Sequence, residues 1–245
     1  MGTDLFTLRE VSKRYGSREV LNIPLLNIEQ GKIHAVLGPN GSGKSTLLRI
    51  LNRLEYPSSG EITFLGQPLL NENGSNTVLR RQMAMVLQKT VMFSTTVLAN
   101  VMYGLEWRKT DRMQARRKAL EALEWVGMHE IANRQARILS GGEAQRVALA
   151  RAIVLQPLVI FMDEPTASMD PNSVMVIEDL IRRVNREFGI TIIVVTHNLF
   201  QASRISNESL FLFQGNLIEK GPTEKIFTCA ADSRTRQFVA GEMIY

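Results

Sequence analysis

Blocks of apolar and polar residues along this chain predict strands and helices in turn. Four blocks are almost entirely apolar, as in strands covered on both faces of a sheet, and they span residues 32–38, 83–88, 157–165 and 190–198. The remaining predicted elements are strands at 5–15, 19–31 and 61–66, a terminal hairpin at 210–221, a polar turn at 71–76, and helices from Lys44 to about Leu54 and over 173–189. Helices that alternate with strands in this order indicate a mostly parallel sheet flanked by helices.

The segment at 92–155 has a different pattern from the rest of the chain. It contains almost no strand signal, and it predicts helices with breaks near Gly104, near Gly127 and at the stretch "SGG", residues 140–142. We therefore expect a helical segment inserted between two strands of the sheet.

The composition is that of an ordinary globular protein. Hydrophobic residues make up 44% of the 245 residues, and no apolar run approaches the ~20 residues that span a bilayer. The single cysteine, Cys229, cannot form an internal disulfide and fits a reducing compartment. The net charge is +5, and its densest run, 112–118, is predicted to be the solvated face of a helix. The apolar side of that helix would carry Ala119, Leu120, Leu123 and Val126.

A glycine-rich stretch, "GPNGSGKST", follows the apolar run at 32–38 and opens the helix at Lys44. It fits the G-x-x-x-x-G-K-[ST] pattern of a phosphate-binding loop, which requires a strand before it and a helix after it. Glycines let backbone N–H groups approach phosphate oxygens, the lysine adds a full positive charge, and the following hydroxyl can reach Mg²⁺. The candidate residues are Gly38, Pro39, Asn40, Gly41, Ser42, Gly43, Lys44, Ser45 and Thr46.

Two carboxylates, Asp163 and Glu164, follow the apolar run at 157–162. Ligands of open α/β sheets bind at the carboxyl ends of the strands, so both side chains are expected beside the phosphate loop. Asp163 is a candidate Mg²⁺ ligand, and Glu164 is a candidate to polarise an attacking water. Without the phosphate loop, the alternative interpretation of the two residues, an acidic pair at a helix N-terminus, would be preferred.

A second glycine pair, Gly141 and Gly142, opens a predicted helix within "LSGGEAQRVALARA". Ser140 and Glu143 have the spacing of a capping box, which accounts for both residues without any ligand. A capping box does not require two glycines, each of which costs backbone entropy. Close approach of an anion to the helix N-terminus would require them.

These three motifs together resemble the ATP-binding subunit of an ATP-binding-cassette transporter, and the resemblance covers nearly the whole chain in the family's order and spacing. It implies a P-loop ATPase with a core at 1–91 and 156–245, an N-terminal antiparallel β subdomain and a helical subdomain at 92–155, in one domain over 1–245. Its implied cofactors are ATP and Mg²⁺. It also implies that two copies of the chain sandwich ATP between them.

The resemblance assigns roles to further residues. Residues that would complete the partner's ATP site in trans are Ser140, Gly141, Gly142, Glu143 and Asp170. Tyr15 would stack on adenine, Gln88 would reach Mg²⁺ and water, and His197 would lie near the γ-phosphate. Glu164, His197, Gln88 and Lys44 form the expected catalytic set, and Ser45, Gln88 and Asp163 the expected metal set. The other histidines, His34 and His129, are interpreted as structural.

This sequence departs from the family's motifs at two places. Glu143 stands where glutamine is common, and "ASM" precedes Asp170 where "SAL" is common. An apolar stretch after Gln88 has two interpretations that stay open. Met92, Phe93, Val97, Met102 and Tyr103 line either a groove for a membrane subunit or the core of the helical segment.

The expected function is ATP hydrolysis that powers solute import through a separate permease, at the cytoplasmic face of the membrane and indirectly served by a solute-binding protein. The overall form and the ending "FVAGEMIY" resemble oxyanion importers, tungstate or molybdate first and then phosphate. An export ATPase is an alternative with the same chemistry. A soluble cassette acting on nucleic acid or ribosomes is disfavoured, because such relatives usually carry two cassettes, a long coiled coil or zinc cysteines, so no nucleic acid partner is expected.

Overall fold

The computed structural model describes residues 3–69, 77–167 and 169–243, so the polar turn predicted at 71–76 lies outside the described residues. The described strands form one sheet in the order β5-β4-β1-β2-β10-β9-β3-β8-β7-β6. They are β1 (Asp4–Tyr15), β2 (Arg18–Glu29), β3 (Ile33–Leu37), β4 (Ser59–Phe64), β5 (Gln67–Pro68), β6 (Met83–Val86), β7 (Val159–Asp163), β8 (Thr191–Val195), β9 (Glu208–Phe213) and β10 (Asn216–Pro222). Helices cover it on both sides, namely α1 (Lys44–Leu51), α2 (Thr77–Arg80), α3 (Val97–Trp107), α4 (Arg112–Trp125), α5 (Gly141–Ile153), α6 (Pro171–Phe188), α7 (Leu199–Ile205), α8 (Thr223–Cys229) and α9 (Ser233–Val239).

The four apolar runs form β3, β8, β7 and β6, which lie side by side at one end of this sheet. β3 pairs with β8 and β9, β8 with β7, and β7 with β6, all in parallel. Because successive side chains of a strand point to opposite faces, each run supplies two cores. Ala35 and Leu37 pack in the core that includes α5 and α6, whereas Val36 packs in the core that includes α1 and the N-terminal strands.

The N-terminal strands pair antiparallel, β1 with β2 and with β4, as the fold class predicts. They extend the same sheet, because β2 joins β10 in parallel at the pair Asn22 and Asn216. This join carries the N-terminal strands alongside the phosphate loop, and the predicted hairpin of β9 and β10 supplies it.

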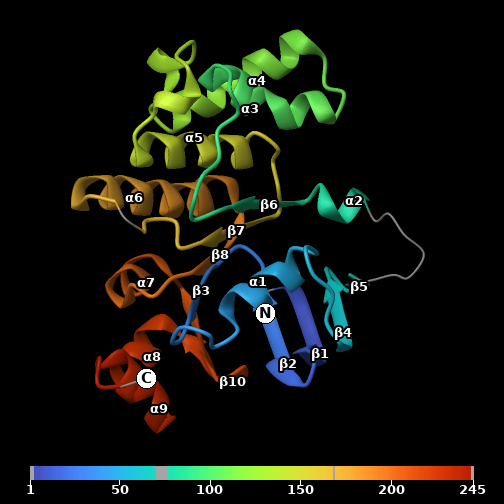
Figure 1. Ribbon diagram of the computed structural model, residues 1–245, viewed down its shortest axis with the longest axis vertical. Helices are drawn as coiled ribbons and strands as arrows, with labels where there is room; N and C mark the ends of the chain where they lie inside the picture. The colour runs from blue at the N-terminus through green and yellow to red at the C-terminus, as the bar shows by residue number, and fades with distance from the viewer. Residues whose placement is uncertain (1–2, 70–76, 168, 244–245) are drawn as a thin grey trace.

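The region at 92–155 lies at one end of the long axis of the molecule, and helices α8 and α9 lie at the other end (Figure 1). Its predicted break near Gly104 is wrong, because α3 continues through that residue to Trp107. A Cβ on Gly104 would lie 3.0 Å from the Leu155 side chain, so the glycine allows close packing rather than a turn. The break near Gly127 is confirmed, with φ at 69° after the end of α4.

Other expected boundaries shift by a few residues. Helix α1 ends at Leu51 rather than near Leu54, and β6 ends at Val86, two residues before Gln88. The hairpin is followed by α8 and α9, so it is not terminal. In the described part of the chain, no helix is both long enough and apolar enough to cross a membrane.

Candidate functional site

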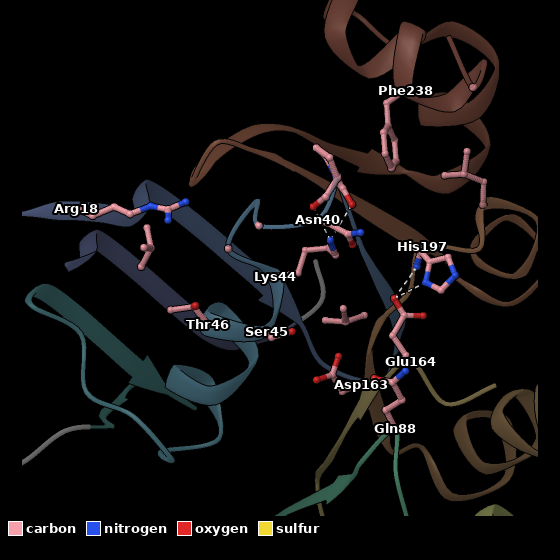
Figure 2. Close-up of a pocket in the computed structure, with 18 residues that line it drawn as sticks. Arg18, Asn40, Lys44, Ser45, Thr46, Gln88, Asp163, Glu164, His197 and Phe238 are labelled. Atoms are coloured by element: carbon pink, nitrogen blue, oxygen red, sulfur yellow. Dashed lines mark hydrogen bonds and ion pairs between the residues drawn. The ribbon is translucent and has the colours of Figure 1, made fainter. Parts of the chain in front are cut away.

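A pocket of about 750 Å³ opens where β3, β7 and β8 end, at the carboxyl edge of the parallel strands. Figure 2 shows Lys44, Asp163, Glu164, Gln88 and His197 around this space. The sequence-predicted residues that line it are Gly38, Pro39, Asn40, Gly41, Gly43, Lys44, Ser45, Thr46, Gln88, Asp163, Glu164 and His197. Four segments that are far apart in the sequence are therefore brought to one small-molecule-sized cavity.

Two different physical requirements explain the glycines of the 38–46 loop. Gly38, Gly41 and Gly43 all have positive φ, at 146°, 76° and 99°. A Cβ on Gly38 would lie 2.1 Å from the Leu212 carbonyl oxygen, and one on Gly43 would lie 2.7 Å from the Val20 carbonyl oxygen. The protein's own backbone thus excludes side chains at both. Among the described residues, apart from the chain neighbours of Gly41, no atom lies within 4 Å of a Cβ on this glycine, so the space beside it is free for a ligand.

Lys44 is the first residue of α1, and its side chain is buried at the base of the loop. The ammonium donates to the carbonyl oxygens of Gly38, at 2.7 Å, and Pro39, at 2.8 Å. Burial lowers the pKa of Lys44, while the charges of Glu164 and Asp163 act in the opposite direction. The loop therefore holds a cation at the helix N-terminus, where phosphate oxygens are favoured.

Asp163 ends β7, half-buried and facing the loop. Burial raises the pKa of Asp163, and the neighbouring charge of Glu164 raises it further. Arg49, Lys44 and a hydrogen bond from Ser45 oppose this shift. A carboxylate that loses solvation in this way gains most from a cation placed against it.

The oxygen atoms of Asp163, Ser45 and Gln88 fit a magnesium ion. Carboxylate, hydroxyl and amide oxygens are hard donors of the kind Mg²⁺ prefers. No cluster of three or more His, Cys, Asp or Glu residues that could hold a metal occurs within the described ranges. One carboxylate with two neutral oxygens suits an ion that takes its remaining ligands from water and substrate phosphates.

Glu164 and His197 form a pair at the edge of the pocket (Figure 2). The Glu164 carboxylate lies 2.8 Å from Nδ1 of His197 and accepts a hydrogen bond from the His197 backbone N–H at 2.9 Å. Glu164 has φ at 46°, and its own N–H donates to the Val195 carbonyl oxygen at 2.8 Å. The end of β8 therefore fixes a conformation that is uncommon for a residue with a side chain, as occurs at functional sites.

Two predicted ligand residues do not line the pocket. Tyr15 is exposed, its hydroxyl donates to the Glu55 carboxylate, and the Lys13 ammonium lies 5.1 Å from its ring centroid. It pairs across the hairpin with Arg18, which does line the pocket, so Tyr15 lies near the rim. Ser42 is buried, and its hydroxyl has no hydrogen-bond partner among the described residues.

The capping box at the start of α5 is confirmed. Ser140 Oγ accepts from the Glu143 N–H at 3.4 Å, and the Glu143 carboxylate accepts from the Ser140 N–H at 2.8 Å. The hydrogen bonds from Ser140, first the backbone and then the side chain, lower the pKa of Glu143. Both side chains thus have partners within their own helix end.

The two glycines at this helix end differ. A Cβ on Gly142 would lie 2.8 Å from Oγ of Ser173 at the start of α6, so close packing against α6 explains why this residue is a glycine. Outside its own helix backbone and chain neighbours, no atom of the part of the chain that the structure describes lies within 4 Å of a Cβ on Gly141. Of this pair, Gly142 is therefore explained by packing within one chain and Gly141 is not. The anion-binding interpretation of the glycine pair rests on Gly141.

None of the residues predicted to act in trans lines the pocket of its own chain. Asp170 caps α6, accepting from the N–H groups of Asn172 and Ser173 at 3.0 Å each. Its role across a dimer stays a prediction, as does that of residues 140–143.

Six lining residues are not among the predicted site residues: Arg18, Val20, Val195, Leu199, Phe238 and Gly241. Arg18 and Val20 come from the start of β2, and Phe238 and Gly241 come from the C-terminal end of the chain. The joining of β2 to β10 and the packing of Phe238 on Phe211, with ring centroids 4.9 Å apart, place them. Both contacts are long-range, so no local pattern could have shown them.

The apolar residues after Gln88 fall into two groups, one that belongs to the core of the helical segment and one that is exposed as a groove for a membrane subunit would require. Val97 and Met102 are buried in the core, and Met92 packs against that core. Phe93 and Tyr103 are exposed, with ring centroids 4.5 Å apart. Tyr103 also lines a hollow of about 260 Å³ between α3, α5 and the end of β6.

Comparisons with known proteins agree with this geometry. The sequence profile of a family described as ABC transporter matches residues 21–167, more than half of the chain. The chain belongs to the ABC transporter family. This cassette is 38% identical to the phosphate import ATP-binding protein PstB 2 of Natronomonas pharaonis, over 96% of this chain and 86% of that protein. It is 37% identical to a probable anion import ATP-binding protein of Haloferax volcanii, over 97% and 87%, and 36% identical to an L-cystine import ATP-binding protein of Bacillus subtilis, over 96% and 97%.

Solved structures of ABC cassettes share its fold. CbiO1 of Clostridium perfringens, part of an ABC transporter complex, matches with a TM-score of 0.87 and 30% identity over 93% of this chain and 92% of that one. A dimeric cassette in a post-hydrolysis state, bound to ADP and Pi, matches with a TM-score of 0.78 and 31% identity over 89% and 98%. The predicted family, fold class and enzyme class, an ABC-type ATPase of an importer, are thus confirmed.

Proposed function

We propose that this chain hydrolyses ATP as the nucleotide-binding subunit of an importer for an oxyanion. One observation carries the enzymatic part: the pocket brings a buried lysine, a half-buried aspartate and the Glu164–His197 pair to the same edge of the sheet. Phosphoryl transfer needs little more from a protein than positioning and charge stabilisation. The site supplies the Lys44 cation, Asp163 as a candidate metal ligand, and the Glu164 carboxylate positioned by His197.

Within this proposal, Lys44 and the loop N–H groups bind the β- and γ-phosphates. Asp163, Ser45 and Gln88 would hold Mg²⁺, which would supply positive charge against the phosphates. Glu164 orients the attacking water, and His197 holds the Glu164 carboxylate through its backbone N–H, at 2.9 Å, with Nδ1 of its ring 2.8 Å away. Tyr15 stacks on adenine at the pocket rim, where its pairing with Arg18 places it.

The second half of each ATP site comes from a second copy of the chain. Residues 140–143 and Asp170 stand outside the pocket of their own chain, and Gly141 leaves open space at a helix N-terminus. Backbone N–H groups at such an end favour an anion. The likeness to a dimeric cassette bound to ADP and Pi supports this arrangement.

The identity of the transported solute is a more specific part of the proposal than ATP hydrolysis by an importer subunit. Relatives named for phosphate import and for anion import support an oxyanion, and a relative named for L-cystine import supports the wider importer class. Phosphate is therefore the first solute to test, with tungstate and molybdate next. Residues of the ATP site do not touch the solute, so its identity rests with the permease and the solute-binding protein.

The permease docks, in this proposal, on the hollow beside Tyr103 at the cytoplasmic face of the membrane. Phe93 and Tyr103 present two exposed rings beside it, in contact and tilted by 41° against one another. Arg151 packs against Phe93, 5.2 Å from its ring centroid, and donates to the Val91 carbonyl oxygen at 2.8 Å. The signature helix α5 thus supports the docking segment directly.

Reconstitution with the partner permease and solute-binding protein in proteoliposomes tests the proposal. ATP turnover should rise when phosphate, tungstate or molybdate is supplied on the binding-protein side, and the Lys44→Ala cassette should show no turnover. If none of these oxyanions stimulates turnover but turnover still depends on Lys44, the assignment of an oxyanion as the solute is refuted and the assignment of ATPase activity stands. Turnover that survives Lys44→Ala would refute the assigned site.

A further inference from the structure

A strongly basic corner joins α3 to α4 at the end of the molecule opposite α8 and α9 (Figure 1). This corner, residues 106–118, holds six basic and two acidic side chains. The basic residues are Arg108, Lys109, Arg112, Arg116, Arg117 and Lys118, and the acidic residues are Glu106 and Asp111. Asp111 is already engaged as the cap of α4, accepting from two backbone N–H groups.

Four cations of this corner lack a close ion-pair partner among the described residues, although Glu121 and Glu124 follow on α4. Within the described ranges, Lys109, Arg112, Arg116 and Arg117 form no ion pair. The arginines of α6 give the contrast: Arg182, Arg183 and Arg186 each lie within 3.9 Å of an acidic side chain. Unpaired, clustered cations of this kind attract a surface of opposite charge.

Two large apolar side chains stand among these cations. Trp107 is 71% exposed and Met113 is 81% exposed. Met113 lies on the same helical face as Arg116 and Arg117, three and four residues further on. Such exposure is unfavourable in water for both side chains, and it is relieved when they enter an apolar medium.

The apolar part of the corner is continuous with the proposed docking site. The ring centroid of Trp107 lies 6.3 Å from that of Tyr103, whose ring in turn packs on Phe93. A permease docked on Phe93 and Tyr103 would bring the membrane surface to the side of the cassette where Trp107 stands. The pattern of one aromatic and one flexible apolar side chain ringed by arginines is that of an interfacial membrane contact.

From this combination we infer that the α3–α4 corner binds the anionic headgroup surface of the membrane beside the permease. Arg112, Arg116, Arg117 and Lys109 contact lipid phosphates, and Trp107 and Met113 enter the headgroup layer. Each basic side chain near an anionic surface strengthens binding about fivefold. The contact would hold the cassette at the membrane independently of which solute is carried, and it is screened by salt.

Vesicle flotation of the full chain tests this inference. The probes are vesicles of phosphatidylglycerol with phosphatidylcholine, and vesicles of phosphatidylcholine alone, at low and physiological salt. We expect binding to the anionic vesicles only, and the double variant Arg112→Gln/Arg117→Gln should bind them roughly 20-fold more weakly. The matched control is Arg182→Gln/Arg186→Gln, which removes the same charge from α6 and should bind as the unaltered chain does.

Tryptophan fluorescence provides a second measurement at the apolar part. In a Trp125→Phe background the emission comes from Trp107 alone, and it should shift to shorter wavelength with anionic vesicles and not with neutral ones. Basal ATP turnover of all variants should be unchanged, which separates failure of this inference from failure of the proposed function.

The inference is overturned by equal binding to neutral vesicles, by an equal loss in the α6 control, or by no shift of the Trp107 emission. Displacement from vesicles by RNA at lower concentration than the lipid would instead identify the corner as a nucleic-acid surface, and would also overturn it.

Discussion

Replacing Glu208 by glutamine should destabilise the fold in a way that depends on pH. Glu208 begins β9, and its side chain is only 10% exposed. Its carboxylate lies 2.8 Å from the Lys32 ammonium and 3.1 Å from the Lys220 ammonium, and 3.5 Å from Nδ1 of buried His34. Burial alone would raise the pKa of Glu208, but hydrogen bonds from Lys32 and Lys220 outweigh it and lower the pKa to about 2.

The size of the effect follows from that pKa. A lowering from 4.5 to about 2 corresponds to roughly 3 kcal/mol of unfolding free energy, at about 1.4 kcal/mol for each pKa unit. Because Lys32 is partly exposed, screening reduces this to about 2–3 kcal/mol. The folded pKa lies below the unfolded one, so this stabilisation is complete above pH 4.5 and is lost as the pH falls toward 2.

Urea unfolding of the unaltered chain and of Glu208→Gln at pH 7 and pH 3.5 measures this. The difference in unfolding free energy should be about 2–3 kcal/mol at pH 7 and should shrink by about 1.4 kcal/mol at pH 3.5, where the unfolded carboxylate is mostly protonated. The control is Glu187→Gln, whose exposed carboxylate lies 3.6 Å from Arg183 and should contribute under about 1 kcal/mol. A difference that stays constant between the two pH values would refute the electrostatic reasoning and leave packing as the cause.

Three further predictions concern the ATP site. Lys44→Ala should abolish tight ATP binding, measured by titration calorimetry, and unchanged affinity would contradict the phosphate assignment. Glu164→Gln should retain ATP, lose hydrolysis by ~10²–10⁴-fold, and shift the solution mass from one chain to two on adding ATP; a monomer with ATP bound would count against sites shared between chains. Gly142→Ala should lower thermal stability, because its Cβ would meet Ser173, whereas Gly141→Ala should leave stability unchanged and weaken the ATP-dependent dimer. Equal effects of the two alanines would remove the distinction between these glycines.

Local patterns in the sequence were sufficient for most elements and for the loop. A phosphate loop is a contiguous stretch between a strand and a helix, so Gly38–Thr46 could be located directly. The parallel strands were visible because burial on both faces leaves uninterrupted apolar runs, and Asp163 and Glu164 could be placed because carboxyl ends of parallel strands share one edge. The capping box of Ser140 was readable for the same reason, since its partners are three residues apart.

The tertiary structure decided what depends on residues distant in the chain. Gly104 was mistaken for a break because glycine marks both turns and close packing, and only the position of Leu155 separates the two. Gly142 likewise has its reason in Ser173, on another helix. The pairing of Glu164 with His197 and the approach of Phe238 to the pocket depend on how strands and helices pack. Side-chain periodicity reports which face of an element is buried, whereas the identity of the residue opposite depends on contacts that no local pattern contains.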